Sequence, residues 1–240
     1  MNINARGLHF KDLNAQIRAA QARDIVVENC LGQRYIGSGL AGKNVVINGL
    51  PGNALGAYLD GSTITVYGNT QEATGDTMNE GEIVIFGNAG DATGYAMRGG
   101  RIYVQGDSGY RTGIHMKEYQ DKIPVVVIGG RVGSFLGEYQ AGGVIVVLGI
   151  GQGGQLPVGY FTGTGMHGGK ILLRSDFEPE GLPPQVICRE ATAEDKQAVL
   201  EFVEGYCQHF GGEAAQLLSQ KFFMLLPNTK NPYKQLYVNN

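Results

Sequence analysis

Three stretches of the sequence carry the glycine spacing of nucleotide-binding loops. The pattern GxGxxG occurs at residues 37–42, 149–154 and 163–168. In a dinucleotide-binding protein this loop follows a strand and opens a helix, so that the helix N-terminus faces the pyrophosphate. None of the three stretches opens such a strand–helix–strand unit. Glycine accounts for 39 of the 240 residues, so matches by chance are expected. The sequence therefore argues against a dinucleotide site.

Residues 37–43 also match the phosphate-loop pattern GxxxxGK. In such loops a Ser or Thr directly after the lysine binds Mg²⁺, and a helix begins at that point. Here the next residue is Asn44, and a strand-like run follows. Phosphate binding at this loop is therefore disfavoured.

Two histidines are the remaining candidates for acid–base chemistry. His115 precedes Lys117, Glu118 and Tyr119 in a short insertion, and His167 lies in a glycine-rich run. No Ser/His/Asp or Cys/His arrangement accompanies either of them, so we assign no catalytic, cofactor-binding or metal-binding residue. We expect His115, Lys117, Glu118, Tyr119 and His167 to contribute to a partner interface. The alternative is an enzyme with a site on the coil face, which requires His115, Lys117, Glu118 and His167 to converge on one pocket with a bound ligand.

The three cysteines, Cys30, Cys188 and Cys207, are far apart in the sequence and form no CxxC or cluster-ligand run. Reduced thiols are therefore expected rather than disulfides or metal ligands. A net charge of −3 gives no electrostatic case for nucleic-acid binding. The longest apolar run, residues 144–148, is too short to cross a membrane, and residues 1–4 do not resemble a signal peptide. A cytoplasmic protein is expected.

The candidate interface residues must be positioned by the strands and turns of the chain, and the sequence pattern of these strands and turns recurs every 19 residues. Each period contains one β-branched run, for example residues 45–47, 64–66, 83–85 and 102–104. Such a run cannot bury its apolar face alone, so successive blocks must stack, with equivalent side chains in columns. One expected buried column is Leu59, Met78, Met97 and Met116, and one expected polar column is Asn69, Asn88 and Asp107. The turn glycines expected at sharp bends are Gly37, Gly56, Gly75, Gly94, Gly113 and Gly137.

These periods predict an all-β fold: a parallel β-helix of about seven to eight coils over residues 25–176. Residues 1–24 are expected to form an N-terminal helical cap, with the helix itself over residues 10–22. Residues 177–240 are expected to form a linker and a small α-helical extension. In that extension Thr192 and Asp195 have the spacing of a capping box, a strand-like run occupies residues 222–226, and a polar tail follows.

Several motifs closely resemble the GXGXG domain of glutamate synthase. More narrowly, the chain looks like the stand-alone form found where the large subunit is split into separate proteins. It is similar, less closely, to the β-helix subunit of formylmethanofuran dehydrogenase. The motifs that carry the resemblance are QRYIGSG at 33–39, GNTQ at 68–71, GDTM at 75–78, GYAMRGG at 94–100, GIHMKEY at 113–119, LGEY at 136–139 and GTGMHGG at 163–169.

The resemblance implies a right-handed parallel β-helix that is a scaffold and not itself catalytic. In glutamate synthase, a cysteine amidohydrolase domain frees ammonia from glutamine, and a flavin and iron–sulfur domain uses it to aminate 2-oxoglutarate. The expected partners are therefore a glutamine amidotransferase subunit and a synthase subunit that carries FMN and iron–sulfur clusters. No cofactor is expected on this chain, and a homo-oligomer is left open. This function belongs to glutamate biosynthesis and nitrogen metabolism. The alternatives are a scaffold subunit of formylmethanofuran dehydrogenase and an enzyme with a site on its coil face.

Overall fold

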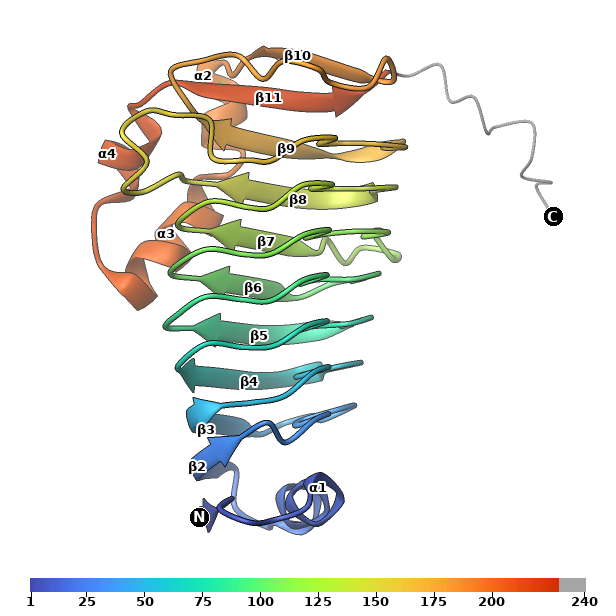
Figure 1. Cartoon of the computed structure of the whole chain (residues 1–240), viewed down its shortest axis with the longest axis vertical. Helices are drawn as coiled ribbons and strands as arrows, with labels where there is room; N and C mark the ends of the chain where they lie inside the picture. Colours follow the sequence, from blue (N-terminus) through green and yellow to red (C-terminus); the bar gives the residue numbers. More distant parts are fainter. Residues whose placement is uncertain (229–240) are drawn as a thin grey trace, which may run out of the picture.

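A computed structural model describes residues 1–228 and shows a mostly β protein with few helices (Figure 1). The described part contains a single 11-stranded sheet with the strand order β1-β2-β3-β4-β5-β6-β7-β8-β9-β11-β10. The strands are β1 (Asn2–Asn4), β2 (Asp24–Leu31), β3 (Asn44–Leu50), β4 (Asp60–Tyr67), β5 (Glu80–Ile85), β6 (Arg101–Val104), β7 (Val125–Ile128), β8 (Ala141–Val147), β9 (Gly168–Arg174), β10 (Val186–Glu190) and β11 (Phe222–Pro227). The helices are α1 (Phe10–Ala19), α2 (Ala193–Gln197), α3 (Leu200–Phe210) and α4 (Ala214–Leu218).

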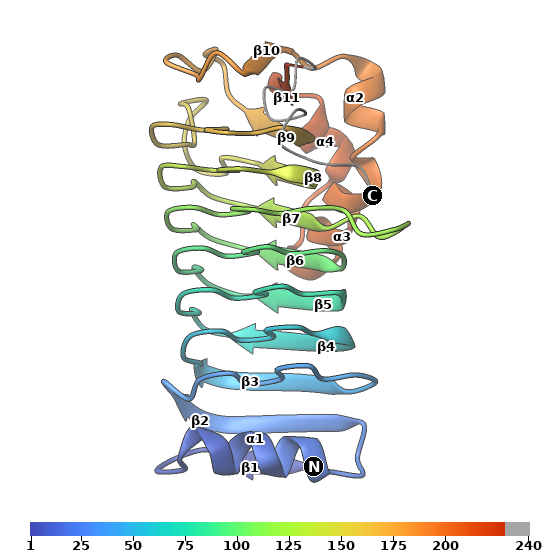
Figure 2. The same cartoon turned by 90° about the vertical axis from the view of Figure 1, so that its right-hand side faces the viewer.

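Strands β1 to β9 pair in parallel, each with the next along the chain. The repeat sets their register, because residues at the same position in successive 19-residue periods (residues of equal phase) are direct partners. Ile64 pairs with Ile83, and Ile83 with Ile102. The side chains of the predicted buried column, Leu59, Met78, Met97 and Met116, are all fully buried. Successive members are in neighbouring loops, because the residue after each of Met78, Met97 and Met116 donates its N–H to the carbonyl of the column member before it. Figure 2 shows the loops stacked in the same order as the strands.

A second set of hydrogen bonds joins the loops that connect the strands. In one loop, Ala54, Gly56 and Tyr58 all have left-handed backbone angles. Ala54 and Tyr58 donate backbone N–H groups to the following loop, and Gly56 donates to the preceding loop, at 2.8 to 2.9 Å. The same geometry recurs at Ala73, Gly75 and Thr77; Ala92, Gly94 and Ala96; Arg111, Gly113 and His115; and Phe135, Gly137 and Tyr139. Each of these loops is therefore fixed to both of its neighbours.

The central position of each loop is glycine because it faces the interior. The six predicted turn glycines have φ between 64° and 73°. A Cβ on Gly56 would lie only 2.6 Å from Ile83 Cδ1, and one on Gly137 would lie 2.6 Å from Ile171 Cδ1. The two flanking left-handed positions carry side chains as large as Tyr and Phe, at a backbone cost of about 1–2 kcal/mol each. The flanking positions therefore accommodate large side chains, whereas a side chain at Gly56 or Gly137 would require a buried isoleucine to move.

A polar column runs along the corners that follow the strands. The Asn69 Oδ1 atom accepts a hydrogen bond from the backbone of Asn88, and Asn88 Oδ1 accepts one from Asp107, both at 2.8 Å. The glycines before these residues have two different roles. Gly68 has positive φ, whereas Gly87 does not, and there a Cβ would lie 2.5 Å from Asn69 Oδ1. Gly87 is therefore required because a side chain there would collide with Asn69, and not because the backbone has a left-handed conformation.

Asn88→Ala is expected to lower the free energy of unfolding by about 1 kcal/mol, because the Asp107 N–H loses its acceptor at a water-exposed corner. Urea denaturation followed by circular dichroism measures this loss. The matched control is Asn53→Ala, an exposed Asn whose side chain makes no hydrogen bond within residues 1–228, which should change stability by less than about 0.5 kcal/mol. Equal losses in the two variants would show that the column does not join the blocks.

The N-terminal end of the stack is covered by β1 and α1. Helix α1 buries Leu13 and Ile17 against the first turns and ends at Ala19, before the predicted end at residue 22. The prediction did not include β1, whose three residues pair in parallel with β2. The N-terminal cap therefore contains a strand in addition to its helix.

The C-terminal segment closes the other end with two antiparallel strands and covers one face of the sheet. Strand β11 pairs with β9 and β10, so the predicted strand at residues 222–226 is present and extends the sheet. The capping box between Thr192 and Asp195 is also present at α2. Helix α3 lies against the outer face of the sheet, where Tyr206 and Val203 join a buried cluster with side chains of β6 to β9. The extension contains the helices α2, α3 and α4, and strand β10 was not predicted.

Candidate partner interface

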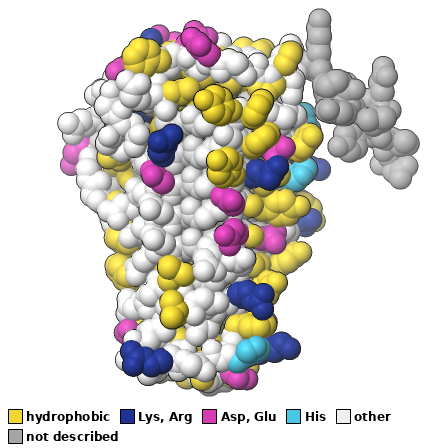
Figure 3. Space-filling model, viewed as in Figure 1, with side chains coloured by type: hydrophobic (Ala, Val, Ile, Leu, Met, Phe, Trp, Pro, Cys, Tyr) yellow, Lys and Arg dark blue, Asp and Glu magenta, His cyan; other side chains and the backbone are white. Residues whose placement is uncertain are grey.

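Aromatic side chains within two residues of the central glycines stack across neighbouring loops. The His115 ring lies 5.9 Å from that of Tyr95 and 5.2 Å from that of Tyr139, measured between centroids. Beside them, Phe135 and Phe161 stack at 5.0 Å. We call these five side chains the aromatic ridge. Figure 3 shows hydrophobic side chains running along the right of the view, where the loops end, mixed with basic, acidic and His side chains.

An ion pair and a cation–π contact border the ridge. The Arg111 Nε atom lies 2.9 Å from Glu138 Oε2, and its guanidinium lies over Phe135, at 5.2 Å from the ring centroid. Interfaces between proteins are enriched in Tyr, Phe and Arg, whereas isolated surfaces rarely carry large contiguous apolar patches. The ridge and the arginine beside it therefore have residue types that are enriched at interfaces between proteins.

Next to the ridge, four of the five predicted interface residues line one pocket. This pocket has a volume of about 320 Å³ and is lined by Ala96, Arg98, His115, Lys117, Glu118 and Tyr119. The Glu118 carboxylate is held in place by the backbone N–H of Gly143 at 2.9 Å, and the Arg98 guanidinium lies 5.7 Å from the Tyr119 ring centroid. Glu118 thus has a structural contact in addition to its place in the pocket.

The predicted insertion between β6 and β7 projects beyond the stack (Figure 2). Reciprocal backbone hydrogen bonds of 3.2 and 3.1 Å between Tyr119 and Lys122 close its tip. An ion pair of 2.7 Å between Lys122 and Glu80 fastens the tip to the stack. Tyr119 and Ile123 are both 51% exposed. The insertion therefore presents two large apolar side chains on an anchored support.

His167 does not join the other predicted interface residues. Its Nδ1 atom lies 3.0 Å from the Gly165 carbonyl oxygen, and it does not line the pocket that contains His115. The structure thus brings His115, Lys117, Glu118 and Tyr119 together and leaves His167 apart. Five further residues were not predicted as site residues: Tyr95, Tyr139, Phe135, Phe161 and Ile123. The first four lie within two residues of a central glycine, and this shared phase is the signal that could have identified them.

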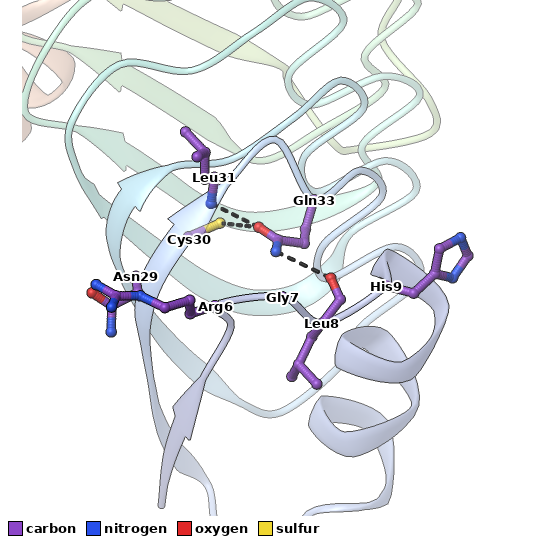
Figure 4. Close-up of a pocket in the computed structure, with 8 residues that line it drawn as sticks. All are labelled: Arg6, Gly7, Leu8, His9, Asn29, Cys30, Leu31 and Gln33. Atoms are coloured by element: carbon purple, nitrogen blue, oxygen red, sulfur yellow. Dashed lines mark hydrogen bonds between the residues drawn. The ribbon is translucent and has the colours of Figure 1, made fainter.

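A second pocket, of about 620 Å³, lies at the N-terminal end and contains Cys30 (Figure 4). The Cys30 thiol donates to Gln33 Oε1 at 3.4 Å, and Gln33 Nε2 donates to the Ala5 and Leu8 carbonyls at 2.8 and 3.2 Å. Burial raises the pKa of the Cys30 thiol to about 11. A thiol must be deprotonated to act as a nucleophile, so burial and the raised pKa both disfavour a nucleophilic role for Cys30. The Gln33 hydrogen bonds fasten the N-terminal segment to the stack.

The other two cysteines, Cys188 and Cys207, are half-buried. All three cysteines are free thiols, and burial also raises the pKa of Cys188, to about 11, and that of Cys207. Within residues 1–228, no group of three or more His, Cys, Asp or Glu side chains is placed to hold a metal ion. None of the helices in that range is both long and apolar enough to span a lipid bilayer.

The loops share one feature, a central glycine that recurs at a fixed position in each repeat with exposed side chains around it. The chain belongs to the GXGXG motif family, whose match extends over residues 13–231. It is 42% identical over 248 residues to a protein of Methanocaldococcus jannaschii described as uncharacterised, and the match covers 98% of this chain and 95% of the relative.

The fold is similar to that of a chain in the formyltransferase/hydrolase complex (FhcABCD) of Methylorubrum extorquens, a structure solved with methylofuran. The TM-score is 0.67 and the sequence identity is 24%, and the match covers 84% of this chain and 72% of the other. At this identity the comparison concerns the fold. That neighbour was solved as part of a complex of several subunits.

Proposed function

We propose that this chain is a non-catalytic scaffold subunit of a split glutamate synthase. In this proposal, residues 25–176 form a right-handed parallel β-helix of about seven to eight coils, with residues 1–24 as the N-terminal cap and residues 177–240 as the C-terminal extension. The observation that carries the scaffold role is the aromatic ridge, which stands beside a projecting insertion on loops hydrogen-bonded to both neighbours. The membership of the GXGXG motif family supports the assignment to this group of enzymes.

A scaffold of this kind would act by fixing distances between other subunits. Each loop is hydrogen-bonded to the loops above and below, so the stack resists bending and holds its outer side chains in fixed positions. In the proposed complex, a glutamine amidotransferase subunit frees ammonia, and a second subunit, with FMN and iron–sulfur clusters, uses it to aminate 2-oxoglutarate. The proposed site of action is the cytoplasm. His115, Lys117, Glu118 and Tyr119 would lie in the interface, with His167 at its margin.

A second candidate is the scaffold subunit of a formylmethanofuran-type complex. The fold likeness to a chain of the FhcABCD complex supports it, at a TM-score of 0.67. The third alternative, an enzyme with a site on its coil face, required His115, Lys117, Glu118 and His167 to converge on one pocket. His167 does not line the pocket that holds the other three, and Glu118 is engaged by Gly143. The geometry thus favours the two scaffold candidates.

The proposed function is tested by purifying the chain from its native cell at endogenous level and identifying the proteins that accompany it. We expect an amidotransferase-like subunit and a flavin-containing iron–sulfur subunit. The isolated chain, given glutamine, 2-oxoglutarate and a reductant, should form no glutamate. Formyltransferase or hydrolase subunits in the purified complex would instead establish the second candidate. Glutamate formation by the isolated chain would refute the scaffold role.

A further inference from the structure

Beyond the aromatic ridge, a pocket of about 700 Å³ opens between the loop that follows β8 and the segment that follows β9. Three aromatic side chains line it: Tyr160, Phe161 and Phe177. They are 80%, 56% and 57% exposed, which is unusual for three neighbouring large aromatic residues. We call this the aromatic–acidic pocket, because Glu178 and Glu180 also line it.

Hydrogen bonds hold the walls of this pocket in place. The Tyr160 N–H donates to Ser134 Oγ at 3.0 Å, and the Phe177 N–H donates to Ser175 Oγ at 3.0 Å. Ser175, which is buried, in turn donates its hydroxyl to the Phe177 carbonyl at 2.8 Å. The aromatic side chains are therefore exposed on backbone segments whose positions are fixed, as a preformed binding site requires.

The charges that line the pocket are unpaired within residues 1–228. Glu178 and Glu180 form no ion pair there, and neither does Arg131, which also lines the pocket. Two carboxylates against one guanidinium leave the pocket with net negative charge. Aromatic faces attract cations through their quadrupole, and nearby carboxylates add to this attraction. The chemistry of the pocket therefore matches a cation on an apolar stem.

We propose that the aromatic–acidic pocket receives an arginine or lysine side chain of the partner subunit. The inference rests on the proposed scaffold function and names the partner group that this part of the interface takes. The pocket is continuous with the ridge, since Phe161 lines the pocket and stacks on Phe135. A partner that covers the ridge would therefore reach the pocket with a basic side chain. A volume of about 700 Å³ accommodates a guanidinium and its stem with bound water.

The first experiment uses the isolated full chain and a small cation, so it does not depend on the identity of the partner. N-acetylarginine methylamide is titrated while the ring signals of Tyr160, Phe161 and Phe177 are followed by NMR. Its neutral isostere, N-acetylcitrulline methylamide, is the control ligand. We expect saturable shifts with the arginine compound and binding at least about tenfold weaker with the citrulline compound. Equal binding of the two compounds, or no binding of either, would overturn the proposal.

Substitutions in the pocket should change the affinity of the arginine compound in opposite directions. The double variant Glu178→Gln/Glu180→Gln removes the negative charge and should weaken binding about tenfold at low salt. Arg131→Gln removes the competing cation and should strengthen binding several-fold. These side chains are exposed, so thermal unfolding should stay unchanged and confirm that the variants fold. Weaker binding of the arginine compound in Arg131→Gln would show that Arg131 does not compete with the cation and would overturn the proposal.

The second experiment distinguishes the source of the cation. Residues 229–240 lie outside the described structure and contain two lysines, Lys230 and Lys234. A chain that ends at Asn228 should bind the arginine compound with unchanged affinity. A tenfold gain in affinity would instead identify these lysines as the occupants.

In the native complex, Glu178→Lys/Glu180→Lys should release the partner. Retention of the partner by that variant would overturn the proposal and leave the scaffold function standing, whereas absence of any partner with the unaltered chain would refute the scaffold function itself.

Discussion

Gly68→Ala is expected to lower the free energy of unfolding by about 4 kcal/mol or more. Gly68 follows β4, and a Cβ on it would overlap the backbone carbonyl oxygen of Gly49 in the preceding turn of the stack. A carbonyl fixed by the ladder cannot swing away as a side chain can, so the two turns must separate. Their separation breaks several backbone hydrogen bonds, each contributing about 1 kcal/mol, in addition to the overpacking itself. Urea denaturation followed by circular dichroism measures the loss.

The control for this variant is Gly39→Ala. Gly39 has φ of 60°, and a Cβ there would meet no atom within 4 Å. It should therefore show only the backbone cost of placing alanine in the left-handed region, about 1–2 kcal/mol. If the two variants lose stability equally, the turns of the stack are not in the close contact that the structure describes.

The repeat predicts register because equivalent residues in a parallel ladder are direct partners. A fixed spacing was enough to place Leu59, Met78, Met97 and Met116 in one buried column and Asn69, Asn88 and Asp107 in one polar column. Each of these residues lies in a block that repeats, so its neighbours in space are encoded by its phase. This part of the fold required no knowledge of long-range contacts.

The two ends of the stack could not be derived in the same way. β1 has only three residues, and β10 follows a proline-rich segment, so neither has a periodic pattern of its own. Both strands exist because an exposed edge of the sheet offers them backbone partners. One clue was nevertheless present in the sequence. The strand β7 reads VVVI and is buried on both faces, which indicates that something covers the outside of the sheet there.

The separation of His167 from His115 also follows from phase. Met116 and Met166 occupy the same position relative to the central glycines Gly113 and Gly163. His167 is therefore equivalent to Lys117, and the residue equivalent to His115 is Gly165. The backbone bonds agree, because both Lys117 and His167 donate their N–H to the residue that ends the preceding loop. Two histidines that look alike in sequence thus lie in different columns, and the repeat contained this information.

Substitutions in the exposed insertion should lower the affinity for the partner more than substitutions elsewhere in the proposed interface. The double variant Tyr119→Ala/Ile123→Asp is expected to weaken binding to the purified partner subunits about 100-fold or more. Two large apolar side chains at the tip of an anchored loop have the character of interface hot spots, each contributing about 2 kcal/mol or more. The aspartate adds the cost of burying a charge without a partner. Isothermal titration calorimetry with the partner complex measures the change.

Leu31→Asp is the matched control, because Leu31 is 78% exposed and lies at the end of β2, in the N-terminal part of the stack. It also replaces an exposed apolar side chain with a charge, so it should lower affinity by less than about threefold if binding is confined to the ridge and the insertion. Both variants should unfold at the same temperature as the unaltered chain, since neither change touches the buried columns. Equal losses of affinity in the two variants would mean that the partner binds through general surface hydrophobicity. An unchanged affinity in the double variant would place the interface elsewhere, because the insertion would then have lost both of its exposed apolar side chains without effect.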